Sequence, residues 1–221
     1  QNRSKIVFKK TNMYLFKYQV NLVDFKDILK IKKISKIKKI NILDFGCGSG
    51  SWDEKKINKE INSIYLYDKN KDLIPILKKK YSSRKVSLEF NERKIFKKDI
   101  NIIVFSSVIQ YMSDKELNEI FSKIIRIYKN KKIYIFINDH PLKKRIIELL
   151  MLPFINFNKF VYSLTLINKI QYLITKHYYH DIYKKRYIVN NFFIKKIGFI
   201  DDMKYLRGKF ILIPKSKWCI F

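Results

Sequence analysis

The sequence predicts an α/β protein: a doubly wound, mostly parallel sheet of seven strands with an antiparallel C-terminal hairpin and a helical insert. Short runs of Ile, Val, Leu and Phe recur from Ile40 onward, and runs without polar alternation are typical of strands covered on both faces. Amphipathic helix patterns separate these runs, which favours a doubly wound parallel sheet. Two final strand-like segments lie close together in the chain, and a short connection makes two strands antiparallel.

Five apolar runs are expected as the parallel strands: residues 41–45, 63–68, 86–90, 101–106 and 132–138. Helix patterns lie between them at 71–81 and after Ser113. Ser113 and Glu116 have the spacing of a capping box, in which each residue's side chain accepts from the other's backbone amide. The second of these helices is therefore expected to begin at Ser113.

The C-terminal part of the chain predicts a helix over 187–196, a strand opened by Gly198 and Phe199, and a last strand over 208–214. Two regions lie outside the alternating pattern. Residues 1–39 form an expected N-terminal helical extension with one helix over 19–33, and residues 40–221 form the main domain.

The second outlying region is an insert over about 141–186, between the fifth strand and the hairpin. It is rich in Ile, Leu, Phe and Tyr with interspersed Lys. Three interpretations stay open: a helical lid that excludes water, an amphipathic segment in peripheral contact with an anionic membrane, and additional core packing. Periodicity does not separate them.

The chain is strongly basic, with 48 Lys and Arg against 19 Asp and Glu and a formal charge of +29. Such a charge favours nucleic acid or an anionic membrane as partner. The chain also lacks alanine and is rich in Lys, Ile, Asn, Tyr and Phe, residues with A/T-rich codons, and its lysines are scattered. A compositional origin of the charge is therefore favoured, and nucleic acid is an open but not favoured partner.

Cys47 and Cys219 are the two cysteines, too few for a disulfide framework or a zinc site. They indicate a reducing compartment, so we expect a cytoplasmic protein without a bound metal, with a peripheral membrane location as the alternative. The sequence contains no run of about twenty uncharged apolar residues, so no membrane span is expected.

The most specific pattern is the segment 42–50, ILDFGCGSG. Glycines at the end of a strand turn the chain sharply and let a ligand approach the backbone. A helix expected from about Ser51 would offer amide groups at its N-terminus. The spacing is G-x-G-x-G and differs from the G-x-G-x-x-G of dinucleotide sites. A simple glycine turn or a dinucleotide site is the competing interpretation.

This segment resembles motif I of class I S-adenosylmethionine-dependent methyltransferases, where the loop wraps the methionine half of the cofactor. The resemblance implies S-adenosyl-L-methionine as cofactor. It also implies a set of binding residues in and beside the loop: Asp44, Gly46, Cys47, Gly48 and Gly50.

Three further segments extend the resemblance. Asp68 ends the second expected strand, where an acidic side chain can accept from both ribose hydroxyls; its alternative is a loop or capping residue. Residues 101–114 resemble the family's fourth strand and following turn, although Asn101 replaces the usual Asp. Residues 192–199 with 208–214 resemble its last helix, Gly-Phe turn and terminal hairpin.

The resemblance places residues 107–111 under the cofactor, facing the substrate. Ser107 and Gln110 are expected cofactor contacts, and packing is the alternative role of Gln110 and Tyr111. Asn91, after the third strand, is the expected adenine contact, with Lys98 and Asp99 as the alternative.

Methyl transfer needs an in-line nucleophile, which positioning and removal of water can accelerate, and a general base only where the acceptor must lose a proton. His140 follows the fifth strand, at the edge where open α/β sheets bind ligands. It is the expected catalytic base, with Asp139 and Tyr111 as supporting polar groups. His177 and His180 could form a metal-binding pair, but an exposed aromatic-rich face is the favoured interpretation.

The sequence lacks the Asp/Asn-Pro-Pro-Tyr/Phe signature of amino-methylating nucleic-acid enzymes and the Pro-Cys pair used against pyrimidines. We therefore expect methylation of a hydroxyl or carboxyl on a small molecule, glycan or lipid-linked intermediate. An RNA methyltransferase and a non-catalytic binding protein that retains the cofactor fold are the alternatives.

Overall fold

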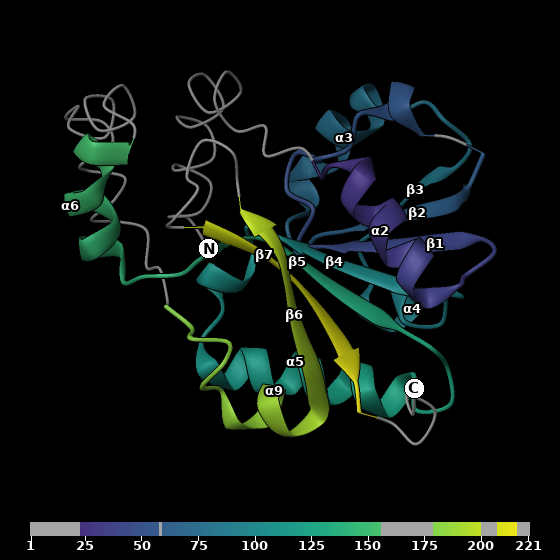
Figure 1. Ribbon diagram of the computed structural model, residues 1–221. Coiled ribbons are helices and arrows are strands. Elements are labelled where there is room, and N and C mark those ends of the chain that lie inside the picture. Colours follow the sequence, from purple (N-terminus) through teal and green to yellow (C-terminus); the bar gives the residue numbers. More distant parts are fainter. Residues whose placement is uncertain (1–22, 58, 156–178, 200–206, 216–221) are drawn as a thin grey trace.

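The computed structural model describes residues 23–57, 59–155, 179–199 and 207–215. Within them, seven strands form one sheet in the order β3-β2-β1-β4-β5-β7-β6 (Figure 1). The strands are β1 Ile40–Phe45, β2 Ile61–Tyr67, β3 Val86–Glu89, β4 Ile102–Ser106, β5 Tyr134–Pro141, β6 Phe192–Phe199 and β7 Arg207–Pro214. Strand β7 is antiparallel to β5 and β6, and the other pairs are parallel. The predicted fold class, including the C-terminal hairpin, is confirmed.

The described helices cover both faces of the sheet (Figure 1). They are α2 Phe25–Ser35, α3 Ile74–Lys80, α4 Glu92–Ile95, α5 Asp114–Ile127, α6 Arg145–Ile155 and α9 Arg186–Asn191, with 3-10 turns η1 Glu54–Lys56, η2 Lys71–Leu73 and η3 Ile109–Tyr111. Successive strand residues point to opposite faces. Phe105 therefore packs in the core with α5, while Val104 packs in the core with α2 and α3.

The N-terminal helix α2 is joined to the sheet by apolar packing and by a partly buried ion pair. Its Ile28 and Ile31 are fully buried in the same core as β1, β2 and β4. Asp27, also buried, lies 2.8 Å from the Nζ atom of Lys209 in β7. The helix was expected over 19–33, but α2 begins at Phe25, behind the capping side chain of Asp24, and ends at Ser35. Residues 1–22 lie outside the described part.

Helix α5 begins where its capping box predicts. Glu116 N donates to Ser113 Oγ at 3.3 Å, and Ser113 N donates to Glu116 Oε2 at 2.8 Å. The stripe that faces the sheet is apolar and buried: Leu117, Ile120, Phe121 and Ile124.

The helix predicted over 187–196 is wrong beyond residue 191. Helix α9 ends at Asn191 and strand β6 begins at once with the buried Phe192. Gly198 and Phe199 end this strand instead of opening one, and they pair with the start of β7. The spacing of apolar residues fits a helix as well as a strand, and the long antiparallel ladder to β7 decides in favour of the strand.

The insert contributes α6 and the segment 179–185 to the described structure, and residues 156–178, with His177, lie outside it. In Figure 1, α6 stands apart from the sheet and from α2, α3 and α5. None of the described helices is both long enough and apolar enough to span a bilayer.

Candidate functional site

The glycine loop lies at the carboxyl end of β1, beside the switch point between β1 and β4 where open α/β sheets bind ligands. Gly46 N and Cys47 N both donate to the carbonyl oxygen of Tyr67, at 2.8 and 3.0 Å, which ties the loop to the end of β2. Gly46, Gly48 and Gly50 have φ angles of +75°, +55° and +83°. These angles lie in the left-handed region that favours glycine.

The three glycines differ in what their missing side chains would meet. A Cβ atom on Gly46 would lie 2.4 Å from Val108, and one on Gly50 would lie 2.4 Å from the hydroxyl of Tyr81. A Cβ atom on Gly48 would meet nothing within 4 Å. The loop is thus packed at both ends and open at its centre, where a ligand can approach the backbone.

Asp68 follows β2 and points its carboxylate at this open centre. Its Oδ2 atom accepts from Gly48 N at 2.9 Å, and its Oδ1 atom accepts from Asn70 N at 2.8 Å. A carboxylate has about four acceptor sites. These two bonds therefore leave acceptor capacity for a pair of neighbouring hydroxyl groups.

Asp44 lies below the loop and is fully buried. Its Oδ2 atom accepts from Trp52 Nε1 at 2.8 Å and from Ser51 Oγ at 3.3 Å. Its Oδ1 atom has no hydrogen-bond partner in the described structure. Burial, with a smaller contribution from the nearby carboxylate of Asp68, raises the pKa of Asp44 to about 7. A buried oxygen without a donor is costly, so a donor from a bound ligand would be stabilising here.

The chain that follows the loop is held by side chains, and the helix predicted from about Ser51 is wrong. Residues 51–53 lie in no helix or strand, and Asp53 is extended before the short turn η1. Trp52 N donates to the hydroxyl of Tyr81 at 3.1 Å, and that hydroxyl donates to Trp52 O at 3.2 Å. Side chains from α3 and its end thus satisfy backbone groups that a helix would have satisfied.

The contributions of Trp52, Lys80 and Tyr81 were missed from the sequence. Lys80 Nζ donates to Gly50 O at 2.5 Å and to Ser49 O at 3.2 Å. Burial lowers the pKa of Lys80. One sequence signal could have indicated these contacts. Lys80 and Tyr81 end the helix pattern over 71–81, and in a doubly wound sheet this helix end lies beside the glycine loop.

Cys47 lies within the loop and is buried. Burial raises the pKa of its thiol well above the ordinary range, so the thiol stays protonated. Cys47 therefore contributes packing and a neutral side chain to the loop.

Asn91 lies at the same edge of the sheet, after β3. Its Oδ1 atom accepts from Arg93 N at 2.9 Å and from Lys94 N at 3.2 Å, which caps α4. Its side-chain oxygen is thus engaged in the cap, and the amide nitrogen is the group that could meet an adenine ring.

A second cluster lies after β4. Ser107 has φ +56°, unusual for a residue other than glycine, and its N donates to Asn138 O at 3.0 Å. Gln110 is buried, and its Nε2 atom donates to Ser107 O at 3.1 Å. Both Nη atoms of Arg207 donate to Gln110 Oε1 at 3.2 Å. Gln110 therefore links the turn after β4 to β7, in agreement with the packing alternative, while Tyr111 is 46% exposed.

Arg207 was also missed from the sequence. It is buried and begins β7, opposite the end of β5. The sequence signal for Arg207 was its position as a charged residue directly before the apolar run 208–214.

His140 lies near the end of β5 and is buried. One extra residue in β5 against β7, between Ile137 and His140, forms an irregularity of the kind that re-aims side chains near sites. His140 Nε2 lies 2.6 Å from the carbonyl oxygen of His180. A carbonyl only accepts, so Nε2 carries the proton, and the neutral ring has its lone pair on Nδ1. The structure describes only the backbone of Asp139.

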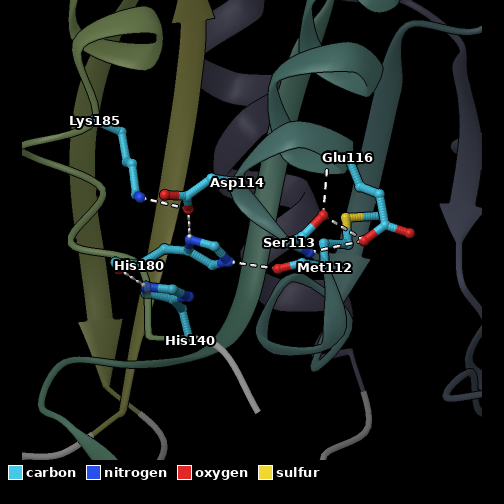
Figure 2. A network of polar contacts seen from close by, with 7 residues as sticks. All are labelled: Met112, Ser113, Asp114, Glu116, His140, His180 and Lys185. Atoms are coloured by element: carbon cyan, nitrogen blue, oxygen red, sulfur yellow. Dashed lines mark hydrogen bonds and ion pairs between the residues drawn. The ribbon is translucent and has the colours of Figure 1, made fainter. Parts of the chain in front are cut away.

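His180 is buried, so the expectation that it lies on an exposed face is wrong. Figure 2 shows its ring between the start of α5 and His140. Its Nε2 atom lies 2.8 Å from Met112 O, and its Nδ1 atom lies 2.9 Å from Asp114 Oδ1. The Lys185 ammonium, hydrogen-bonded to Asp114 Oδ1 at 2.5 Å, holds the pKa of Asp114 below its ordinary value. The end of the insert is thus fixed to α5 beside His140.

The structure therefore brings the predicted residues into separate groups. Asp44, the glycine loop and Asp68 form one group, and the turn after β4 with the end of β5 forms the other. Asn91 lies at the end of β3, beyond Asp68. Among the described residues, no group of three or more His, Cys, Asp or Glu could hold a metal ion.

No model of a known protein family matches the sequence, and no curated protein sequence matches it. Solved structures of low sequence identity do match the fold. An S-adenosylmethionine-dependent methyltransferase from Anabaena variabilis has a TM-score of 0.62 at 13% identity, over 98% of this chain and 94% of that one.

Two further structures are similar over less of the chain. Magnesium protoporphyrin IX methyltransferase from Synechocystis PCC 6803, with bound S-adenosylhomocysteine, has a TM-score of 0.53 at 13% identity, over 85% of this chain and 80% of that one. The N-methyltransferase NodS from Bradyrhizobium japonicum, in complex with S-adenosylhomocysteine, has a TM-score of 0.50 at 10% identity, over 86% and 85%. At these identities the likeness shows the fold, which is that of class I methyltransferases.

Proposed function

We propose that this chain, which has the fold of class I S-adenosylmethionine-dependent methyltransferases, binds S-adenosylmethionine and methylates a hydroxyl or carboxyl group. The acceptor is a small molecule, a glycan or a lipid-linked intermediate. One observation carries the proposal: the glycine loop is open at Gly48, directly beside the carboxylate of Asp68. The fold alone would not support an activity.

The residues of this group fit a sulfonium nucleoside. The two remaining acceptor positions of Asp68 suit the vicinal ribose hydroxyls. The open face of Gly48 admits the methionine half of the ligand against the backbone. The unpartnered Oδ1 atom of Asp44 adds a buried acceptor below the loop, which favours a ligand with positively charged donors. Asn91 would meet the adenine ring through its amide nitrogen.

S-adenosylmethionine supplies an electrophilic methyl group, so this chain must orient the acceptor, exclude water and, for a hydroxyl acceptor, take up a proton. We assign proton uptake to Nδ1 of His140, because its Nε2 proton is held by His180 O. Asp139 and Tyr111 are the supporting polar groups. Ser107 would contact the cofactor from the turn after β4, while Gln110 holds that turn against β7. Support for these roles is their position at the carboxyl ends of β4 and β5.

The proposal is tested by incubating the protein with methyl-labelled S-adenosylmethionine and fractionated cell extract. We expect label in a small-molecule, glycan or lipid fraction, at a rate that falls at least about a hundredfold in His140→Ala for a hydroxyl acceptor. Label in RNA would replace this acceptor class with the RNA alternative. Cofactor binding without label in any fraction would indicate the non-catalytic alternative.

A further inference from the structure

The exposed face of helix α6 is apolar. Five large side chains on this helix are between 43% and 84% exposed: Ile146, Ile147, Leu150, Met151 and Phe154. At 3.6 residues per turn they fall within an arc of about 140°. Every side chain of α6 that the structure describes as exposed belongs to this set. We call these five residues the α6 face.

An apolar face turned to solvent is unusual for a helix of a globular protein. A surface helix normally turns its apolar stripe to the core and its polar side to water, as α5 does. Contiguous exposed apolar side chains mark an interaction surface, whereas single ones need no explanation. Figure 1 shows α6 standing off from the sheet, and the exposure of its five apolar side chains shows that they lie outside the main core.

The charges around α6 favour an anionic partner. Lys143 and Lys144 are exposed directly before the helix. Between Glu148 and Asp181 the sequence has three lysines and no acidic residue. A second copy of this chain would carry the same formal charge of +29, so like-charge repulsion opposes self-association through this basic region.

The chemistry of the α6 face favours a bilayer over a protein partner. None of its five side chains has a strong hydrogen-bonding group. A protein interface of standard size needs about one hydrogen bond per 100–200 Å². A helix that lies in a membrane interface needs an apolar face with basic residues beside it.

We propose that the α6 face, with Lys143 and Lys144, docks this protein on an anionic membrane surface. Helix α6 begins a few residues after β5, the strand that carries His140. Docking would place this edge of the sheet at the bilayer. If docking is combined with the proposed methyl transfer, the acceptor is an amphipathic molecule held in the membrane. This assignment of the acceptor rests on the proposed function.

Vesicle flotation of the whole protein tests the docking without cofactor or acceptor. The probes are vesicles of phosphatidylcholine alone and vesicles with about 30 mol% phosphatidylglycerol, at about 0.15 M salt. We expect flotation with the anionic vesicles and at least about tenfold weaker binding to phosphatidylcholine.

Two variants separate the apolar and the electrostatic contributions. The triple variant Ile146→Ser, Leu150→Ser and Phe154→Ser is expected to bind anionic vesicles at least about tenfold more weakly. Lys143→Gln with Lys144→Gln is expected to weaken binding by roughly tenfold to thirtyfold on anionic vesicles only. The matched control Ile127→Ser, Val189→Ser and Phe193→Ser removes three exposed apolar side chains elsewhere and is expected to bind like the unmodified protein.

Absence of flotation by the unmodified protein, or unchanged flotation of the α6 variant, would overturn the proposal. Self-association in sedimentation that the α6 variant abolishes, without vesicle binding, would also overturn it by assigning the face to a second copy. S-adenosylhomocysteine binding by the same preparations is measured separately, so failure of membrane docking and failure of the proposed methyl transfer are distinguishable.

Discussion

Asp44 is the residue at which the end of β1, the glycine loop and Trp52 meet. Its carboxyl group is buried with one oxygen hydrogen-bonded and the other without a donor. Burial raises its pKa from 3.8 to about 7, so the group resists ionisation in the ligand-free protein. A bound cation would favour the ionised form, which makes Asp44 sensitive both to pH and to ligand.

The raised pKa predicts a pH-dependent stability. A folded-state pKa above the unfolded value contributes stability that is fully present at low pH and is lost as pH rises, here between about 4 and 7. Asp44→Asn should remove this dependence, so the unmodified protein should lose up to about 4 kcal/mol relative to the variant across that window. Urea unfolding of both proteins at several pH values measures the difference. Parallel pH profiles would contradict the raised pKa.

Substitutions of Gly46 and Gly48 are expected to differ in their effects on protein stability and on ligand binding. Gly46→Ala should lower the free energy of unfolding by at least about 2 kcal/mol, because its Cβ atom would overlap Val108 and its φ is positive. Gly48→Ala should lower it by only about 1 kcal/mol, since its Cβ atom meets nothing, yet it should weaken S-adenosylhomocysteine binding at least about tenfold. Thermal unfolding and calorimetry give both quantities. Equal ligand affinity in Gly48→Ala and the unmodified protein would refute the open-centre account.

The sequence predicted the positions of the loop glycines and of Asp68, while their roles in cofactor binding stay a prediction. The loop glycines and Asp68 follow strand ends, and strand ends are readable from apolar runs. The roles of Trp52, Tyr81 and Arg207 depend on side-chain contacts between segments far apart in the chain, as with Gln110 and Arg207. Such contacts leave no local pattern.

At the scale of elements, strong local signals were read correctly and ambiguous ones were not. The capping box set the start of α5, because both of its hydrogen bonds form within four residues. The segment 187–199 has apolar spacing compatible with two structures. Its division into α9 and β6 is decided by β7, which follows later in the chain.

The cap predicts a measurable contribution to stability. Ser113→Ala should lower the free energy of unfolding by about 1 kcal/mol, because an orphan amide of the first turn of α5 loses its acceptor. Ser122→Ala, an exposed position in the same helix, is the matched control and should change it by less than about 0.5 kcal/mol. Chemical denaturation measures both. Equal effects of the two substitutions would show that the Ser113 side chain contributes no more to stability than an ordinary exposed serine.

At the scale of the whole molecule, the formal charge of +29 acts on every state of the chain. Like charges in a compact protein repel, and salt screens them over about 10 Å at 0.1 M. The melting temperature should therefore rise by several degrees between about 0.02 and 0.5 M sodium chloride. Differential scanning fluorimetry measures this shift. A melting temperature that falls with salt would indicate that ion pairs, not repulsion, dominate the electrostatics.

In the proposed function, the open glycine loop and Asp68 bind the cofactor together. Calorimetry with S-adenosylhomocysteine tests it most directly, on the unmodified protein, on Asp68→Ala and on Asp72→Ala, a control that removes an exposed carboxylate nearby. We predict binding by the unmodified protein, at least about tenfold weaker binding by Asp68→Ala and unchanged binding by Asp72→Ala. Absence of both heat and thermal stabilisation in the folded, unmodified protein would contradict the account.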